Sequence, residues 1–328
     1  MIICRTPMRI SFFGGGTDFP KWYLENEGLV ISTSIDKYCY VTCRFLPNIF
    51  DYNYRLRYFF SEEVKNIDDI KHPSFREVLR KYPTKNNILE LVHNADLPAM
   101  SGLGSSSSST VSAINALNAL LKKKISKEHL AKEAINIEQN ILKDHVGSQD
   151  QIIASYGGFN LIEFKKNKKF IVRPITNQKN INSIETSILL IYTGLQRNAS
   201  VVEKDKLINF KKNEKYYKNI YDITKHVYSN LVSKNFDLIN FGKLLSEQWK
   251  NKKALSKFVT NKLIDEIYDE GMRLGASGGK LLGAGNGGFL LFICDRKSKL
   301  KISKSLKNFF DTKIKFSYKG SEILKIQK

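Results

Sequence analysis

Apolar residues recur along the chain at two spacings, which together predict a mixture of strands and helices. Runs rich in β-branched and aromatic residues predict strands in the first third of the sequence, at 1–13, 28–34, 38–45 and 87–95. Apolar residues three or four positions apart follow Ser105 and again follow Ser126. This spacing predicts one helix that starts at Ser105 and a second, amphipathic helix that starts at Ser126.

The second half of the sequence predicts a hairpin, a long helical region and a Gly-rich loop before its last helix and strand. The expected elements are strands at 159–164, 170–172, 187–192 and 289–294, helices between 201 and 273, and a loop at 275–288. A polar segment at 176–183 is the best candidate for a domain boundary. Because strands and helices do not alternate in a regular strand–helix–strand rhythm, the expected fold class is α+β rather than doubly wound α/β.

The segment 97–110 differs from the rest because it is small, polar and Gly-rich and leads directly into a periodic helix. Gly102 and Gly104 permit positive φ angles and close backbone approach, and the serines after them can cap the helix. Free N–H groups and the helix dipole at such a start favour negative charge. A flexible Gly/Ser linker would not lead straight into a helix. The sequence therefore predicts a phosphate loop at 97–110.

Composition and charge narrow the class of protein. The 328 residues are 42% hydrophobic and 11% aromatic, which is ordinary for a globular chain with a sizeable core. No apolar run approaches the roughly eighteen residues of a membrane span, and the N-terminus has no signal-peptide core, so we expect a cytoplasmic protein without a membrane partner. The net charge of +21 suggests nucleic acid, but the lysines are scattered and no arginine-rich arm accompanies them. We therefore expect no nucleic-acid partner.

Several known phosphate-binding signatures do not fit this sequence. A Walker A loop requires G-x-x-x-x-G-K-[ST], whereas Gly279-Lys280 is followed by leucine. Residues 283–288 match the letters of a dinucleotide fingerprint, but here a helix precedes and a strand follows, the reverse of a Rossmann unit. The protein-kinase signature set is missing as well. The phosphate loop therefore belongs to another class.

Three motifs resemble, in order, those of the GHMP kinases (galacto-, homoserine, mevalonate and phosphomevalonate kinases). They lie at 7–18, at 98–109 with Gly-Leu-Gly-Ser-Ser at the centre, and at 278–289. The resemblance implies an N-terminal α+β nucleotide-binding domain over 1–176, a ferredoxin-like C-terminal domain over 184–328, and an active site in the cleft between them. It also implies ATP as the phosphoryl donor and Mg²⁺ as the cofactor.

The same resemblance implies roles for individual residues. The ATP phosphates would be bound by Ser101, Gly102, Leu103, Gly104, Ser105, Ser106 and Ser107. Ser106 and Glu138 would bind Mg²⁺, which prefers oxygen ligands, and Asp144 is the competing metal ligand. Asp150 matches the family's catalytic aspartate, which accepts or orients the proton of the substrate hydroxyl, and Arg9 matches its cationic partner. Without the resemblance, Asp150 would be interpreted as a helix cap and Arg9 as a surface residue.

The acceptor is predicted from the first motif, which has Gly-Gly-Gly-Thr-Asp at 14–18 where galactokinases have Gly-Glu-His-Thr-Asp. This string and the serine run resemble the branch that phosphorylates the anomeric C1 hydroxyl of D-glycero-D-manno-heptose 7-phosphate, for nucleotide-activated heptose and surface polysaccharide. Substrate contacts are expected from Gly15, Gly16, Thr17, Asp18, Lys37, Arg197, Gly285 and Asn286. Arg197 is the first choice for the sugar phosphate, with Lys37, Arg44 and Lys280 as alternatives.

Two other functions stay open from the sequence. An anomeric kinase of an unphosphorylated sugar such as fucose would carry similar motifs. A non-catalytic sugar- or ATP-binding regulator would be expected to lack the catalytic pair, whereas Asp150 and Arg9 are both present. The expected function is therefore a sugar-phosphate kinase that binds a small-molecule substrate, with a homodimer as an open alternative for its assembly.

Overall fold

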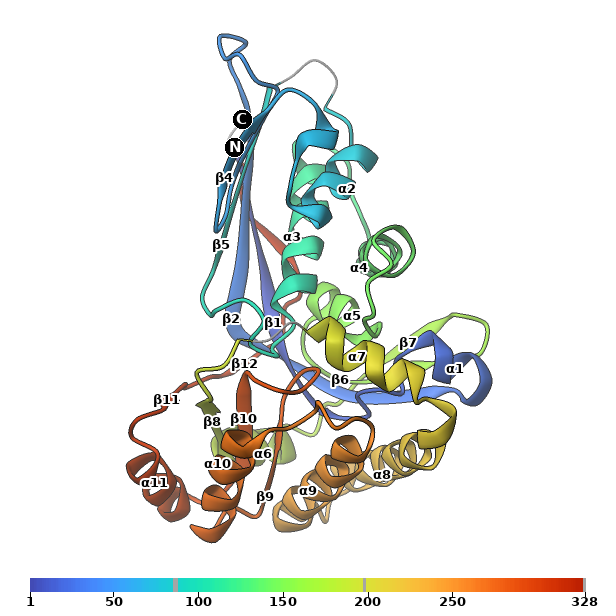
Figure 1. Cartoon of the computed structure of the whole chain (residues 1–328), viewed down its shortest axis with the longest axis vertical. Helices are drawn as coiled ribbons and strands as arrows, with labels where there is room; N and C mark the ends of the chain where they lie inside the picture. The colour runs from blue at the N-terminus through green and yellow to red at the C-terminus, as the bar shows by residue number, and fades with distance from the viewer. Residues whose placement is uncertain (85–87, 197–198, 327–328) are drawn as a thin grey trace.

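The computed structural model describes residues 1–84, 88–196 and 199–326. Its strands form two sheets, with helices packed beside each (Figure 1). The described strands of the first sheet are β1 (Ile2–Phe13), β2 (Gly28–Leu46), β3 (Tyr54–Arg57), β4 (Ser61–Val64), β5 (Ile88–Ala95), β6 (Phe159–Phe164), β7 (Phe170–Pro174), β12 (Phe316–Ser317) and β13 (Glu322–Ile326). Those of the second sheet are β8 (Ile188–Tyr192), β9 (Gly278–Leu281), β10 (Phe289–Ile293) and β11 (Phe310–Asp311).

The two helices predicted after Ser105 and Ser126 are present as α3 and α4. The described α-helices are α1 (Pro20–Asn26), α2 (Pro73–Lys81), α3 (Ser105–Leu120), α4 (Lys127–Ile135), α5 (Gln149–Tyr156), α6 (Gln178–Ser187), α7 (Ala199–Ile208), α8 (Glu214–Val232), α9 (Leu238–Ala254), α10 (Lys262–Arg273) and α11 (Arg296–Ser305). A π-helical turn, Asn136–Ile141, continues α4. Short 3-10 helices lie at Ile67–Asp69 and Lys211–Asn213.

Strand β2 organises the first sheet. Its first six residues pair with β6, whereas its C-terminal half pairs with β5, and β1 pairs along most of its length. The two strands predicted at 28–34 and 38–45 are therefore one continuous strand of 19 residues. The register of β1 against β2 shifts between Pro7 and Arg9, which is the irregularity expected where a long strand bends to change partners.

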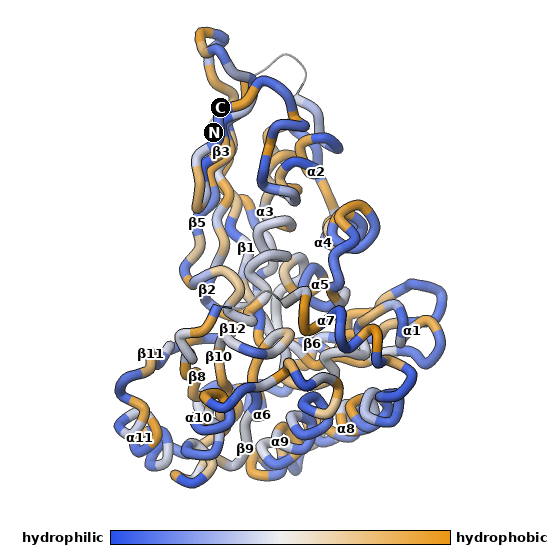
Figure 2. The backbone as a smooth tube through the Cα atoms, in the orientation of Figure 1, coloured by the Kyte–Doolittle hydropathy of each residue, from blue (hydrophilic) through white to orange (hydrophobic). Residues whose placement is uncertain are grey.

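A shared core joins the two halves of the molecule. Phe12 and Phe13, at the end of β1, contact the ring of Phe241 in α9 edge to face, with centroids 5.7 and 5.1 Å apart. The same apolar cluster includes Leu190 of β8 and Leu291 of β10, and these two strands are hydrophobic throughout (Figure 2). One close-packed cluster therefore spans both sheets, so the two halves of the molecule share a core.

The end of the described chain returns to the first sheet. Strand β13 pairs with β1 and strand β12 pairs with β2, so both termini lie at the same end of the molecule (Figure 1). Strands β12 and β13 therefore lie in the sheet of the N-terminal half, although the sequence grouped them with residues 184–328. The division at 176 and 184 stays a prediction, and the polar boundary segment is mostly helix α6.

The predicted α+β fold class is confirmed. One local prediction is wrong: the Gly-rich segment 275–288 contains strand β9, which pairs with β10. A Cβ on Gly278 would clash with the backbone of Gly242 in α9, and a Cβ on Gly279 would clash with β10. All four cysteines are buried free thiols. Within the described residues, no helix is long and apolar enough to cross a membrane.

Two histidines lie together near the start of α2. The ring of His72 stacks on Phe75 with centroids 3.9 Å apart, and its Nδ1 accepts a hydrogen bond of 3.3 Å from the Phe75 N–H. Burial lowers the pKa of His72 and of His93 to about 4 each. The unfolded chain takes up these protons near the ordinary pKa of 6.5, so stability is lost as the pH falls from 6.5 towards 4.

We expect His72→Asn to weaken this acid sensitivity, because asparagine can cap a helix without titrating. Between pH 7 and pH 5 the variant should lose about 1–2 kcal/mol less unfolding free energy than the wild type, as measured by urea denaturation. His226→Asn, at an exposed site on α8, is the matched control and should follow the wild type. Equal losses in all three proteins would exclude His72 as the titrating group.

Candidate active site

A cleft with a volume of about 220 Å³ lies where the three sequence motifs meet. The start of α3, the start of α5 and the loops that follow β1 and β9 form its walls. The first three walls belong to the N-terminal half and the last to the C-terminal half, together with α7 and α9. The cleft therefore collects residues that lie far apart in the sequence.

Arg9 connects these walls through both its backbone and its side chain. Its N–H donates to the Leu103 carbonyl over 2.9 Å, and its Nη1 donates to the Gly102 carbonyl over 2.6 Å. Its Nε and Nη2 donate to the two carboxylate oxygens of Asp150, each over 2.7 Å. Arg9 is buried, whereas the Asp150 side chain keeps 23% exposure. This bidentate pair fixes the carboxylate while leaving it open to the cleft.

Within the phosphate loop, Gly104 directly precedes α3 and has a left-handed φ of 74°. A Cβ at this position would lie 3.0 Å from Cγ of Arg9, so glycine suits both the backbone and the space. The N-cap residue of α3 is Gly104, which has no side chain with which to cap the helix, and the exposed Ser106 lies in the first turn. First-turn N–H groups without a cap, together with the helix dipole, can bind an anion.

The seven predicted ATP-phosphate residues fall into two groups. Gly102, Gly104 and the serines at 105–107 line the cleft. Ser101 and Leu103 do not, because their side chains are buried and their carbonyls accept from Phe289 and Arg9 respectively. These two residues therefore hold the backbone of the loop in place without lining the cleft.

Glu138, the predicted metal ligand, lies in the π-helical turn after α4 and is only 2% exposed. Its Oε2 accepts from the Ser107 hydroxyl over 2.8 Å and from Nε2 of Gln151 over 2.5 Å. Its Oε1 is buried and has no hydrogen-bond partner in the described part of the chain. Burial raises the pKa of Glu138 to about 7.

A buried carboxylate oxygen without a partner and an exposed serine that line the same cleft are donors that suit a hard divalent cation. The competing ligand, Asp144, also lines the cleft but is exposed. Among the residues that the structure describes, no group of three or more His, Cys, Asp or Glu side chains could hold a metal by itself. Ser106 and Glu138 therefore fit a cation that completes its shell with other oxygen ligands.

Asp18 connects the 14–18 loop to α5. It is 1% exposed and accepts from the Gly16 N–H over 2.9 Å, from the Gln149 N–H over 3.2 Å and from Gln149 Nε2 over 3.1 Å. Burial raises its pKa to about 6. Gly15 and Gly16 line the cleft beside it. Thr17 does not, because its hydroxyl bonds within the loop to Gly14 and to β2.

Other predicted substrate residues are not brought to the cleft. Lys37 lies on β2 with its Nζ 3.7 Å from an Asp36 carboxylate oxygen, and it does not line the cleft. Asn286 donates from its N–H to the Val259 carbonyl over 2.7 Å, and Gly285 packs against the same residue. Arg197 lies outside the described residues.

The sequence prediction missed two lysines of the cleft. Lys206 of α7 and Lys252 of α9 line it together with Lys280 of β9, which the sequence named only as an alternative for the sugar phosphate. In a chain with 53 lysines and arginines, neither helical lysine is conspicuous. The spacing from apolar residues could have identified both lysines, since Lys252 follows the buried Trp249 by three positions and Lys206 follows the buried Val202 by four. Such spacings place each lysine on the buried face of its helix.

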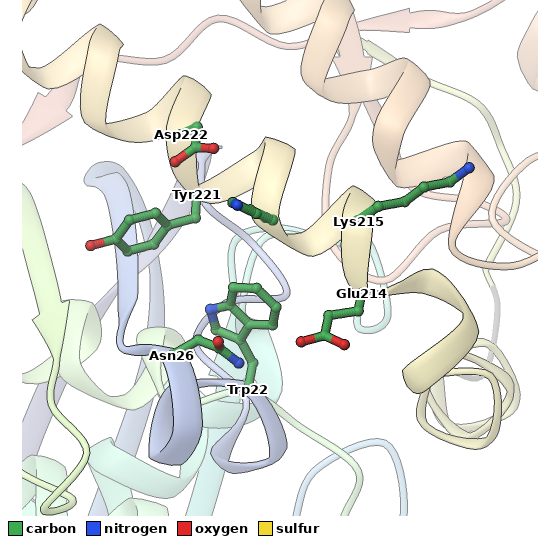
Figure 3. Close-up of a pocket in the computed structure, with 7 residues that line it drawn as sticks. Trp22, Asn26, Glu214, Lys215, Tyr221 and Asp222 are labelled. Carbon is green, nitrogen blue, oxygen red and sulfur yellow. The ribbon is translucent and has the colours of Figure 1, made fainter.

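A second pocket, of about 460 Å³, lies between α1 and α8 (Figure 3). Trp22 and Asn26 line it from α1, and Tyr221 and Asp222 line it from α8. Its lining contains none of the predicted site residues and mixes charges of both signs. We therefore assign the chemistry to the cleft.

Comparisons with known proteins give matches in both halves of the chain. Residues 71–158 match the GHMP kinases N terminal domain, and residues 229–312 match the GHMP kinases C terminal family. The chain is 31% identical to the D-glycero-alpha-D-manno-heptose 7-phosphate kinase of Campylobacter jejuni over 315 residues, covering 92% of each chain.

Two further relatives are more distant. The chain is 24% identical to the bifunctional fucokinase/GDP-fucose pyrophosphorylase of Arabidopsis thaliana, over 90% of this chain but 30% of that protein. The solved structure of a D-glycero-D-manno-heptose 1-phosphate kinase from Bacteroides thetaiotaomicron matches with a TM-score of 0.81 at 23% identity, covering 100% of both chains. This last likeness shows a common fold.

We expect Gly147→Ala to destabilise the protein, because the new Cβ would lie 1.9 Å from Oδ2 of the buried Asp18. Displacing that carboxylate from its three hydrogen bonds should cost about 1–3 kcal/mol of unfolding free energy, measured by urea denaturation. Gly15→Ala is the control, since its Cβ would meet Gln149 and Ser11 at an ordinary 3.6 Å. If both variants unfold at the same urea concentration, a methyl group at position 147 does not displace the Asp18 carboxylate.

Proposed function

Because the chain belongs to the GHMP kinase family, we propose that this sugar kinase transfers the γ-phosphoryl group of ATP to the anomeric C1 hydroxyl of D-glycero-D-manno-heptose 7-phosphate. The product would be the 1,7-bisphosphate, for nucleotide-activated heptose and surface polysaccharide. The observation that carries this choice of acceptor is the 31% identity with the Campylobacter jejuni enzyme over 92% of both chains. The name of the Campylobacter jejuni enzyme states its acceptor, and we propose the same acceptor for the present chain.

The phosphate loop would bind the donor. The uncapped N–H groups at the start of α3 and the positive end of its dipole suit the ATP phosphates. Ser106 and Glu138 would hold Mg²⁺, which neutralises charge on phosphate oxygens when bound. The unpartnered Oε1 of Glu138 supports this assignment over Asp144, which is exposed to solvent.

Asp150 would orient the attacking hydroxyl and accept its proton. Each carboxylate oxygen has a second lone pair besides the one that accepts from Arg9, so a sugar hydroxyl can bond to the same group. Phosphoryl transfer depends mainly on such positioning and on neutralising charge, and the Arg9 guanidinium lies where it can do both. Within the described residues, the Gln149 Oε1 atom is buried without a partner and lines the same cleft, so it can accept from another sugar hydroxyl.

The substrate prediction is tested by comparing heptose 7-phosphate with its dephosphorylated form. We expect kcat/KM to be at least about tenfold higher for the phosphorylated sugar, because a charge-assisted phosphate contact contributes roughly 1.5–3 kcal/mol. Equal values would favour the alternative, an anomeric kinase of an unphosphorylated sugar such as fucose, for which the Arabidopsis relative is the supporting observation. ADP release that no sugar stimulates would favour a non-catalytic regulator.

Asp150→Asn should lower kcat by about 10²–10⁴-fold, because an amide cannot accept the hydroxyl proton. The dissociation constant for ATP should change little, since Asp150 lies on α5 rather than in the phosphate loop. Both are measured by coupled ADP release and by calorimetric titration. Asp269→Asn removes the same charge from the exposed face of α10 and serves as control. A wild-type kcat in Asp150→Asn would contradict the assigned role.

A further inference from the structure

Three lysines converge on one wall of the cleft from separate elements. Lys206 of α7, Lys252 of α9 and Lys280 of β9 are 5%, 7% and 3% exposed, and all three line the cleft. We call these residues the lysine cluster. Lysine is seldom buried to this extent unless its charge is paired, so the burial of these three side chains needs an explanation.

Each ammonium group of the lysine cluster is held by two oxygen acceptors. Lys280 donates to the carbonyls of Ser11 (3.0 Å) and Phe12 (2.8 Å), Lys252 to those of Leu281 (3.1 Å) and Gly283 (2.5 Å), and Lys206 to Glu203 Oε1 (2.9 Å) and the Ala284 carbonyl (2.8 Å). An ammonium group has three donors. One donor of each lysine is therefore left for a ligand, and the two acceptors hold each group in a defined position.

Positive charge in the cluster exceeds the negative charge beside it. Among the described residues, Lys206 has an ion pair with Glu203, while Lys252 and Lys280 have no carboxylate within 4.0 Å. Burial, the Arg9 charge and the Lys206 charge lower the pKa of Lys280 to about 7. Burial and then the neighbouring lysines lower the pKa of Lys252 as well. A bound anion would relieve this repulsion and keep all three groups protonated.

A buried hydroxyl beside the cluster also lacks a partner. Ser11 lines the cleft and is 6% exposed, and its Oγ makes no hydrogen bond within the part of the chain that the structure describes. The Ser11 carbonyl is one of the two acceptors that position Lys280. The cluster therefore presents three N–H donors and one hydroxyl, which is the complement of a phosphate group with its several acceptor oxygens.

The cleft already has a place for the donor phosphates at the start of α3, on the wall that the N-terminal half forms. The lysine cluster lies on elements of the C-terminal half, whereas the guanidinium nitrogens of Arg9 already donate to Asp150 and to the Gly102 carbonyl. We propose that Lys206, Lys252, Lys280 and the Ser11 hydroxyl form a subsite for the phosphate monoester of the sugar acceptor. This inference rests on the proposed function, since it assumes an acceptor that carries its own phosphate.

Lys206→Met tests the inference at the member of the cluster that lies on α7, whose two acceptors are Glu203 and a loop carbonyl. The variant should lower the ratio of kcat/KM for heptose 7-phosphate over dephosphorylated heptose by about 10- to 100-fold, while the KM for ATP stays within about twofold of wild type. Lys204→Met is the matched control, because it removes the same charge from an exposed position on the same helix. Its ratio should equal that of the wild type.

A second measurement does not depend on turnover. Inorganic phosphate is titrated calorimetrically into protein saturated with Mg²⁺ and a non-hydrolysable ATP analogue, which occupy the donor loop. Wild type and Lys204→Met should bind phosphate, and Lys206→Met and Lys252→Met should bind it at least about tenfold more weakly. A circular-dichroism melt of each variant establishes that it is folded.

The outcomes separate the inference from the proposed function. If the wild type prefers heptose 7-phosphate and Lys206→Met keeps the same ratio of kcat/KM for the two sugars, the inference is wrong and the proposed function still stands. If Lys206→Met lowers kcat/KM equally for both acceptors and raises the KM for ATP, the lysine cluster binds the donor phosphates instead. A wild type without any preference would refute the proposed acceptor, and the phosphate titration would then decide by itself whether the anion subsite exists.

Discussion

The bonds made by Arg9 connect the walls of the candidate active-site cleft. Its backbone N–H and one guanidinium nitrogen bind two consecutive carbonyls of the phosphate loop, and its other two nitrogens bind the Asp150 carboxylate. One residue on β1 thereby sets the distance between the loop that would bind the donor and the carboxylate that would orient the acceptor. Gly104 leaves the space that this arrangement needs. A buried, bidentate and permanently charged group is well suited to such a role, because a lysine could not make the same fork.

Much of this architecture can be predicted from the sequence, because local patterns specify it. The serine-rich run after Gly104 begins α3 at Ser105, where the periodicity placed it, and β1 and β5 also lie close to their predicted positions. The three motifs meet in one cleft, as the family resemblance implied. What local patterns could not specify were pairings between distant segments. Neither the continuity of β2 nor the return of β12 and β13 to the first sheet has a signature within its own residues.

The site shows the same limit at the level of single residues. Thr17 lies in a motif that suggested a substrate contact, yet its hydroxyl is used within the loop and by the adjacent strand. Lys206 and Lys252 lie in no motif, yet they reach the cleft because α7 and α9 pack against the Gly-rich segment after β9. A sequence motif indicates which segments meet, whereas packing of the C-terminal half decides which side chains enter the space between them. This explains why the basic residues of the cleft differ from most of those that the sequence suggested.

The return of the chain to its first sheet affects how the protein is made. The ribosome synthesises β12 and β13 only after α6 to α11 and the entire second sheet. Until then, β1 has an open edge where β13 will pair, and an unpaired edge strand is a site for association with other chains. The nascent N-terminal half therefore carries an exposed edge throughout the synthesis of the C-terminal half. Its sheet is completed only after translation of nearly the whole described chain, so vectorial folding cannot finish one half before the other.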